Sequence, residues 1–389
     1  MTAKKLIGQL HLWLGIASGL VVIVVALTGA VLVFEEEIDE WANKDFYFVE
    51  VPAHAQRLPL DHLLQQAKTY DTSLRISNIH TVTAEADRSV LFTGRKEKRS
   101  WNIAVNPYTG QVIRAIERDK RFFSIVLQLH RYLLMGKVGK AITGVSCLIF
   151  VFLVISGIIL WWQKKLKMLK QRVKIKWNGS GKRLNWDLHA VGGFYVHLCL
   201  FVISFTGLTW AYEWFNKGIY LVFDGKPQKK FVVPANKTQQ PITVGFYEQV
   251  YTKANERLPY KGEINISIPD KDSLSITVSK QNFDASVSNI SDVLYYEKGT
   301  GELLKERLYT NESLGTKARR MVYPLHTGSL YGWPTKILAL ISALVAVSLP
   351  ITGFRIWLGR KKKAKKPVAV RRSTTVNEPL PVREIAING

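Results

Sequence analysis

The chain has 389 residues and a formal net charge of +24, which could indicate nucleic-acid binding. The basic residues gather, however, in two clusters that adjoin long apolar runs. Residues 164–183 hold nine Lys or Arg residues and no acid, and residues 360–372 hold eight more. Such clusters are typical of cytoplasmic loops and tails of membrane proteins, and neither is long enough to fold as a nucleic-acid-binding domain. The two cysteines, Cys147 and Cys199, lie inside apolar runs and argue against thiol redox chemistry.

The first apolar run covers residues 12–34 and follows Lys4 and Lys5. It is longer than the apolar core of a secretory signal and ends in Glu35-Glu36-Glu37 without a small-residue cleavage site. The pattern therefore predicts a retained membrane helix with its N-terminus in the cytoplasm.

Three further apolar runs cover residues 141–162, 190–212 and 337–358. Each is long enough to cross a bilayer, which takes about 20 helical residues. Because basic flanks stay in the cytoplasm, both basic clusters are expected inside and residues 35–123 and 213–322 outside. The sequence thus predicts a multi-pass protein of the bacterial inner membrane with both termini cytoplasmic. The tail beyond Lys366 is polar and is expected to be disordered.

Both external segments show the pattern of small α+β units. In the first, a helix is expected to begin near Asp61, and in the second a helix is expected over residues 243–254. Short β-rich stretches follow each helix. They cover residues 76–82, 89–93 and 101–105 in the first segment and residues 264–268, 274–278 and 293–296 in the second.

The predicted fold class is a membrane α-helical protein. Four transmembrane helices form two parallel-repeat pairs that carry two extracytoplasmic α+β lobes. The expected order is helix 1 (1–34), lobe 1 (35–123), a histidine segment with helix 2 (124–163), a basic loop (164–186), helix 3 (187–212), lobe 2 (213–322), a histidine segment with helix 4 (323–359) and a basic tail (360–389).

Histidines recur at matched spacings in the two halves of the chain. His11 and His189 each lie 17 residues before a Thr-Gly pair, and His130 and His326 each lie 27 residues before a glycine. The two spacings match without gaps, so the pattern indicates duplication of a unit of helix, external domain and helix. Halves that keep their orientation pack about a pseudo-twofold axis along the membrane normal.

Such an axis would bring His11 toward His189 at the cytoplasmic side and His130 toward His326 at the outer side. Two neutral imidazoles that face each other between helices are the axial ligands of a bis-histidine haem. The pattern therefore predicts two b-type haems. The alternatives are interfacial histidines without a ligand and a histidine-bound metal ion, for which no nearby carboxylate or cysteine is at ligand spacing.

His197 lies eight residues, or about 12 Å, beyond His189 on the same predicted helix. A histidine at that depth is a functional candidate. It could replace His189 as a ligand, bind a haem propionate or mark an asymmetric site. His54, His62 and His80 are expected at the outer surface.

Aromatic and cationic residues lie close in sequence to the expected outer haem. Together they could stack on and attract a bulky anionic iron chelate. An interfacial aromatic belt with snorkelling arginines is the alternative, and Arg131 could instead pair with a haem propionate. The candidates for substrate binding are Tyr132, Tyr331, Trp333, Arg319 and Arg320, with Tyr323 nearby.

Several of these stretches resemble the PepSY-associated transmembrane family over essentially the whole chain to about Lys366. The stretches are His11-Leu12-Trp13-Leu14-Gly15, Leu27-Thr28-Gly29, Leu129-His130-Arg131-Tyr132-Leu133, Asp187-Leu188-His189 and Pro324-Leu325-His326-Thr327-Gly328. The resemblance extends to iron-regulated inner-membrane proteins of the FoxB-like siderophore reductase type. It implies PepSY-like lobes, haem at His11, His130, His189 and His326, and a ferric siderophore as substrate.

The expected activity is haem-dependent, one-electron reduction of a ferric siderophore in the periplasm. Hard oxygen chelators hold Fe(II) more weakly than Fe(III), so reduction would release the iron. The electron donor, cytoplasmic or in the membrane, is not encoded, since no Gly-rich nucleotide fingerprint follows a strand. The alternatives are a non-enzymatic membrane anchor whose lobes bind or inhibit a partner, and a siderophore transporter.

Overall fold

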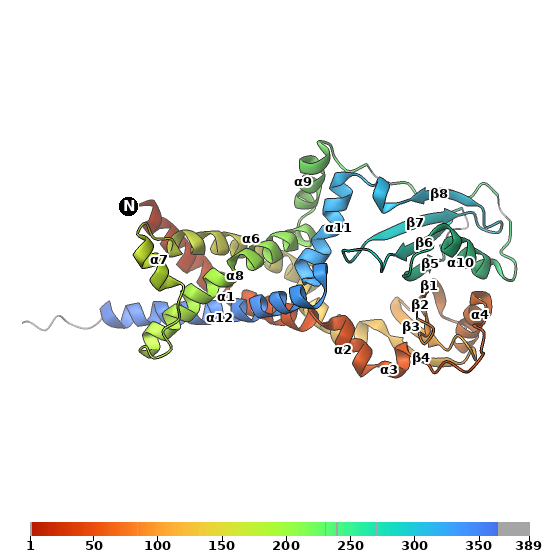
Figure 1. The fold of residues 1–389 in the computed structure, drawn as a ribbon, viewed down its shortest axis with the longest axis horizontal. Coiled ribbons are helices and arrows are strands. Elements are labelled where there is room, and N and C mark those ends of the chain that lie inside the picture. Colours follow the sequence, from red (N-terminus) through yellow and green to blue (C-terminus); the bar gives the residue numbers. More distant parts are fainter. Residues whose placement is uncertain are drawn as a thin grey trace, which may run out of the picture.

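A computed structural model describes residues 2–364 apart from residues 84, 230, 239, 270 and 272. Figure 1 shows a helical bundle at one end of the molecule and a β-sheet with its covering helices at the other. The expected disordered tail beyond Lys366 lies outside the described residues.

Four long helices form the bundle, which confirms the four predicted spans. They are α1 (Ala3–Leu32), α6 (Gly136–Trp161), α8 (Gly181–Ala211) and α12 (Trp333–Ala364). Each contains a stretch apolar enough and long enough to cross a membrane, and each begins several residues before its predicted apolar run because polar residues continue the helix. The helix N-terminus of α1 and the described end of α12 lie far from the sheet (Figure 1).

The helices α1 and α8 occupy opposite corners of the bundle. Each of them packs against both α6 and α12. Small residues let the backbones approach, as where a Cβ built on Gly19 would lie 3.2 Å from Pro350 of α12. Side chains on the facing sides of α1 and α8 therefore meet across the middle of the bundle.

Eight antiparallel strands form one sheet in the order β4-β3-β2-β1-β5-β6-β7-β8. The strands are β1 (Arg75–Val82), β2 (Val90–Lys96), β3 (Arg99–Val105), β4 (Val112–Glu117), β5 (Glu263–Ser267), β6 (Ile276–Gln281), β7 (Ser291–Tyr296) and β8 (Leu303–Arg307). The two predicted external lobes therefore share one sheet and do not form separate α+β units. The strands β1 and β5 pair directly, with His80 opposite Asn265, because two exposed strand edges gain hydrogen bonds when they join.

One face of the sheet is covered by α4 (Leu60–Tyr70) and α10 (Phe246–Arg257), which hold the main apolar core between them and the strands. Successive side chains of a strand point to opposite faces of the sheet, which explains this core. Ile79 of β1 and Ile264 of β5 point toward the helices and are fully buried. His80, the neighbour of Ile79 in β1, lies on the other face, together with polar residues of the adjacent strands.

Ile79→Ala is expected to lower the free energy of unfolding of the sheet domain by about 2–5 kcal/mol, because it leaves a cavity where the two strand sets join. Urea unfolding of the purified protein, followed by tryptophan fluorescence, measures this change. Val244→Ala is the matched control, since Val244 is fully exposed. Equal midpoints for the two variants would contradict the placement of Ile79 at the centre of the core.

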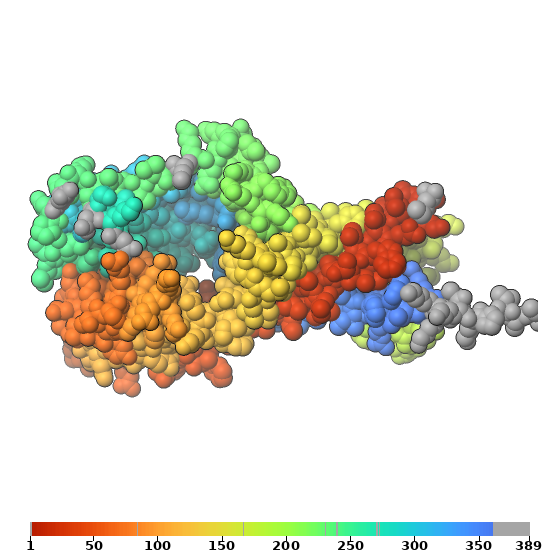
Figure 2. All heavy atoms as spheres, turned by 180° about the vertical axis from the view of Figure 1, so that it is seen from behind, coloured from red at the N-terminus to blue at the C-terminus, as the bar shows by residue number. Residues whose placement is uncertain are grey.

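Shorter helices join the bundle to the sheet and pack around the bundle ends. They are α2 (Glu35–Ala42), α3 (Lys44–Tyr47), α5 (Phe122–Tyr132), α7 (Leu166–Arg172), α9 (Glu213–Asp224) and α11 (Leu314–Thr327). Of these, α5 packs against α1, and α11 packs against α8 and α9. Figure 2 shows an opening between the sheet and the bundle at this junction.

Sharp turns connect α5 to α6 and α11 to α12. Leu133 and Leu134 adopt positive φ angles of 48° and 59° after α5. Gly328 has a φ of 78° after α11, and a Cβ there would lie 2.6 Å from the Cβ of Ala339, so only glycine fits. Because of these turns, the last turns of α5 and α11 lie against the bundle.

Candidate functional site

The four histidines of the matched spacings form two pairs, one near each end of the bundle. The rings of His11 in α1 and His189 in α8 have centroids 6.4 Å apart. The rings of His130 in α5 and His326 in α11 have centroids 6.3 Å apart. We name the first the basic-end pair, because it lies toward the end that carries residues 164–183, and the second the sheet-end pair.

The sheet-end pair is oriented by backbone carbonyls of the long helices. His130 Nδ1 lies 2.9 Å from the carbonyl oxygen of Val25, and His326 Nδ1 lies 2.8 Å from that of Ile203. A carbonyl oxygen can only accept, so Nδ1 carries the proton and donates it in both rings. Each Nε2 therefore keeps its lone pair for another partner.

The basic-end pair is held in the same way. His189 Nδ1 lies 3.1 Å from the carbonyl oxygen of Leu349 in α12 and must donate to it. His11 Nδ1 lies 2.8 Å from Ser156 Oγ in α6, and that hydroxyl donates to the carbonyl of Leu153. The serine oxygen is thus left to accept the Nδ1 proton of His11, so Nε2 of this ring also keeps its lone pair.

A glycine on a neighbouring helix lies against each imidazole. A Cβ built on Gly29 would lie 3.2 Å from His130 Cε1, and one on Gly207 would lie 3.3 Å from His326 Cε1. The corresponding distances are 3.5 Å from Gly157 to His11 and 3.2 Å from Gly353 to His189. These are the glycines of the matched spacings. Glycines close in sequence to His11 and His189, such as Gly15 and Gly192, instead face Leu153 and Val345.

Burial favours the neutral form of both imidazoles of the sheet-end pair. Burial, together with the charge that a protonated His326 would add, lowers the pKa of His130 to about 4. Burial also lowers the pKa of His326. Neutral imidazole is the form that binds metal ions.

The two pairs are separated along the bundle by most of the length of α1. His11 is part of α1, and His130 packs against Gly29 of the same helix, 18 residues further on. At a rise of about 1.5 Å per residue, this corresponds to about 27 Å. The pairs are therefore independent sites and not one cluster.

His197 belongs to neither pair. Its ring stacks on Phe194, with centroids 5.7 Å apart, and Phe194 stacks in turn on Trp161 of α6 at 3.9 Å. His197 Nδ1 lies 2.5 Å from the carbonyl oxygen of Phe194. The side chain thus faces α6, whereas His189 contacts α12 and the ring of His11.

The predicted arginines near the sheet-end pair have partners within the protein. Arg319 donates to Asn216 Oδ1 at 2.5 Å and lies over Trp210, whose ring is 5.0 Å from that of His326. Arg320 donates to the carbonyl of Ser291 at 2.5 Å. Both arginines therefore fix α11 to its surroundings.

Two of the other predicted residues at this end, Tyr331 and Tyr323, are exposed. Arg131 lies over the ring of Tyr132 at 5.1 Å. Tyr331 is 66% exposed and Tyr323 is 47% exposed, so both rings are open to a ligand or to lipid.

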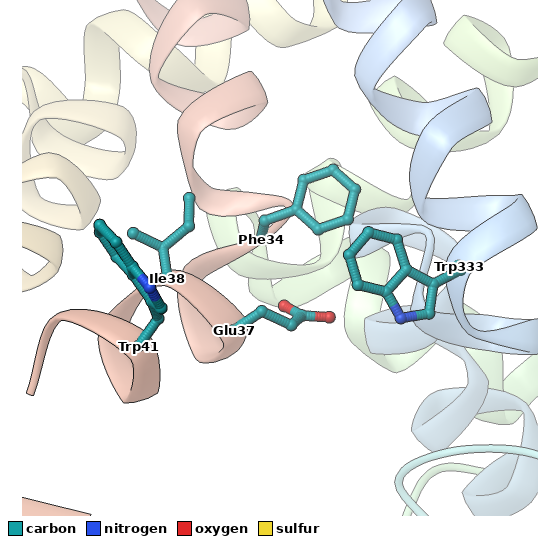
Figure 3. A pocket seen from close by; sticks show the side chains of 5 residues that line it. All are labelled: Phe34, Glu37, Ile38, Trp41 and Trp333. Carbon is teal, nitrogen blue, oxygen red and sulfur yellow. The ribbon is translucent and has the colours of Figure 1, made fainter. Parts of the chain in front are cut away.

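Trp333 lines a small open pocket where α2 meets the start of α12. Figure 3 shows its ring beside that of Phe34, with the carboxylate of Glu37 next to both rings and Ile38 and Trp41 on the far side of Phe34. The rings of Phe34 and Trp333 have centroids 5.1 Å apart.

Glu37, which lines this pocket, forms an ion pair with Lys336 at a distance of 2.7 Å. The second carboxylate oxygen of Glu37 is buried without a hydrogen-bond partner. Sequence analysis did not identify this pair, because 299 residues separate the two side chains and neither belongs to a motif.

The fold defines a polytopic α-helical membrane protein with an additional α+β domain built on one antiparallel sheet. The model of the PepSY-associated TM region matches residues 9–360, and the chain belongs to this family. No curated protein matches the chain significantly.

Proposed function

We propose that the protein is a two-haem electron carrier that reduces ferric siderophores. The proposal rests on the two histidine pairs. In every one of the four rings, Nδ1 carries the proton and Nε2 is left for a ligand. In metal sites, a hydrogen bond donated by Nδ1 orients the histidine whose Nε2 binds the metal.

The spacing within each pair would let two imidazoles hold one metal ion between them. An imidazole nitrogen lies about 2 Å from a bound metal ion and its ring centre about 1 Å behind it, so the two ring centres would be about 6 Å apart. The observed distances are 6.4 Å and 6.3 Å. His11 and His189 would hold one haem, and His130 and His326 the other.

A haem held by two histidines would supply one-electron transfer, because neither histidine would leave a position open for oxygen. The chain's own residues exclude water and keep the imidazoles neutral and in place. At the sheet-end pair, burial of His130 and His326 and their bonds to α1 and α8 perform this role.

We further propose that the chain arose by duplication of a unit of helix, external segment and helix. The glycine contacts support it: His130 against Gly29 corresponds to His326 against Gly207, and His11 against Gly157 corresponds to His189 against Gly353. Equivalent residues make equivalent contacts in the two halves.

The basic end would face the cytoplasm and the sheet end the periplasm of a bacterial inner membrane, as the positive-inside rule requires. A ferric chelate would enter at the opening between sheet and bundle (Figure 2). There it would accept one electron, Fe(III) becoming Fe(II), which an oxygen-donor chelator holds more weakly. Trp333, Phe34, Tyr331 and Tyr132 are the aromatic surfaces on which it would rest.

The proposal is tested by measuring haem in protein purified from cells with ample haem supply. A pyridine-haemochrome assay is expected to give two haems per chain, with the spectrum of low-spin bis-histidine iron. After reduction with dithionite, adding a ferric hydroxamate chelate is expected to reoxidise both haems. A colourless protein, which the anchor and transporter alternatives require, would rule the proposal out.

A further inference from the structure

The surface at the basic end is rich in exposed lysines. Among the described residues that form this surface, no acidic residue is exposed. Within residues 2–20, 160–190 and 350–364, the single acid is Asp187, which is fully buried and bound to Arg183 at 2.9 Å. The exposed lysines are Lys4, Lys5, Lys164, Lys165, Lys167, Lys170, Lys174, Lys176 and Lys182.

The segment that carries most of these lysines is fixed to the bundle. Arg172 of α7 donates to the carbonyl of Trp161 at 2.9 Å, and Tyr195 of α8 donates to the carbonyl of Val173 at 3.0 Å. Arg172 and Arg183 also lie over the ring of Trp186, at 5.2 and 5.5 Å. The lysines are therefore presented on an anchored surface, which the positive-inside rule alone does not require.

This surface lies close to the basic-end histidine pair. His11 is eight residues from the first residue of α1, and His189 is eight residues from the first residue of α8. Each imidazole is therefore about 12 Å along its helix from the lysine-bearing end. By contrast, the sheet-end pair lies at the other end of α1.

We propose that this surface is the docking site of an acidic soluble protein that donates single electrons to the basic-end pair. The inference rests on the proposed function, since it assigns an entry point for electrons. In each transfer, the reduced carrier would give up one electron, and a haem held by His11 and His189 would take it up. Opposite charges on the two proteins would steer the encounter and raise its rate about 10-fold or more at low salt.

The experiment follows haem reduction by reduced flavodoxin, an acidic flavoprotein, in a stopped-flow spectrophotometer. The full-length protein is placed in nanodiscs of uncharged phosphatidylcholine, so that lipid charge does not contribute. The wild-type rate is expected to fall about 10-fold or more between low salt and about 0.3 M salt. At low salt, a triple variant is expected to lose most of that rate; its changes are Lys165→Gln, Lys167→Gln and Lys170→Gln.

A matched triple variant at the sheet end controls for net charge and is expected to keep the wild-type rate. Its changes are Lys98→Gln, Lys261→Gln and Lys271→Gln. Dithionite, a small reductant, is expected to reduce the haem equally fast in all three proteins. A flavodoxin rate that is independent of both salt and these three lysines would overturn the docking site, as expected if the lysines serve only lipid headgroups. Absence of haem would instead count against the proposed function.

Discussion

His326→Ala is expected to leave the purified protein with one haem per chain instead of two. The substitution removes one of the two proposed haem ligands at the sheet-end pair, and the other, His130, has its ring centroid 6.3 Å away. The basic-end pair lies about 27 Å away along α1 and should keep its haem. The measurement is the pyridine-haemochrome value per chain, together with the Soret absorbance.

His130→Ala should have the same effect, and the double variant should lose no more haem than either single variant. Residues that act as one unit are non-additive in this way. His197→Ala is the control and is expected to keep two haems, since His197 stacks on Phe194 and contacts neither pair. Full haem content in the His326 and His130 variants would show that the sheet-end pair is not a ligand pair. Loss of haem in the His197 variant would move the ligand assignment to that residue.

Gly29→Val is expected to displace His130 and thereby lower haem content toward one per chain. A Cβ at this position would already lie 3.2 Å from His130 Cε1 and 3.6 Å from its Nδ1. The two further methyl groups of valine have no space unless the ring moves, which would break its bond to the carbonyl of Val25. Gly29→Ala should cause a smaller loss, because only the Cβ has to be accommodated.

Gly218→Val provides the matched control for this effect. Gly218 is also helical, in α9, and a Cβ there meets nothing within 4 Å. The control should keep two haems, so that a loss seen only at Gly29 reports contact with the imidazole and not a general cost of valine in a helix. If Gly29→Val retains both haems, the ring of His130 does not need the position described here.

His326→Ala and Gly29→Val test two different requirements for haem binding at the sheet-end pair. The histidine substitution removes a ligand, whereas the glycine substitution leaves all four histidines in the chain and changes only where one of them can lie. Agreement between them would support the view that the neighbouring helix, through Gly29 and the Val25 carbonyl, is what prepares His130 for iron.

The sequence by itself determined the four membrane spans, the family and the candidate residues. These features are local: an apolar run of about 20 residues predicts a membrane helix wherever it occurs. The spacings of His11 and His189 to their Thr-Gly pairs, and of His130 and His326 to their glycines, can be counted along the chain. Most strands were also predicted near their observed positions, because alternation of apolar residues is a local pattern as well.

The tertiary structure alone decided which atoms meet. The sequence does not show that His11 bonds to Ser156, 145 residues away, or that Glu37 pairs with Lys336. Nor does it show that β1 and β5 join two strand sets into one sheet. Each of these contacts depends on how helices or strand edges pack, and packing is set by the fit of many side chains at once, with no pattern along the chain.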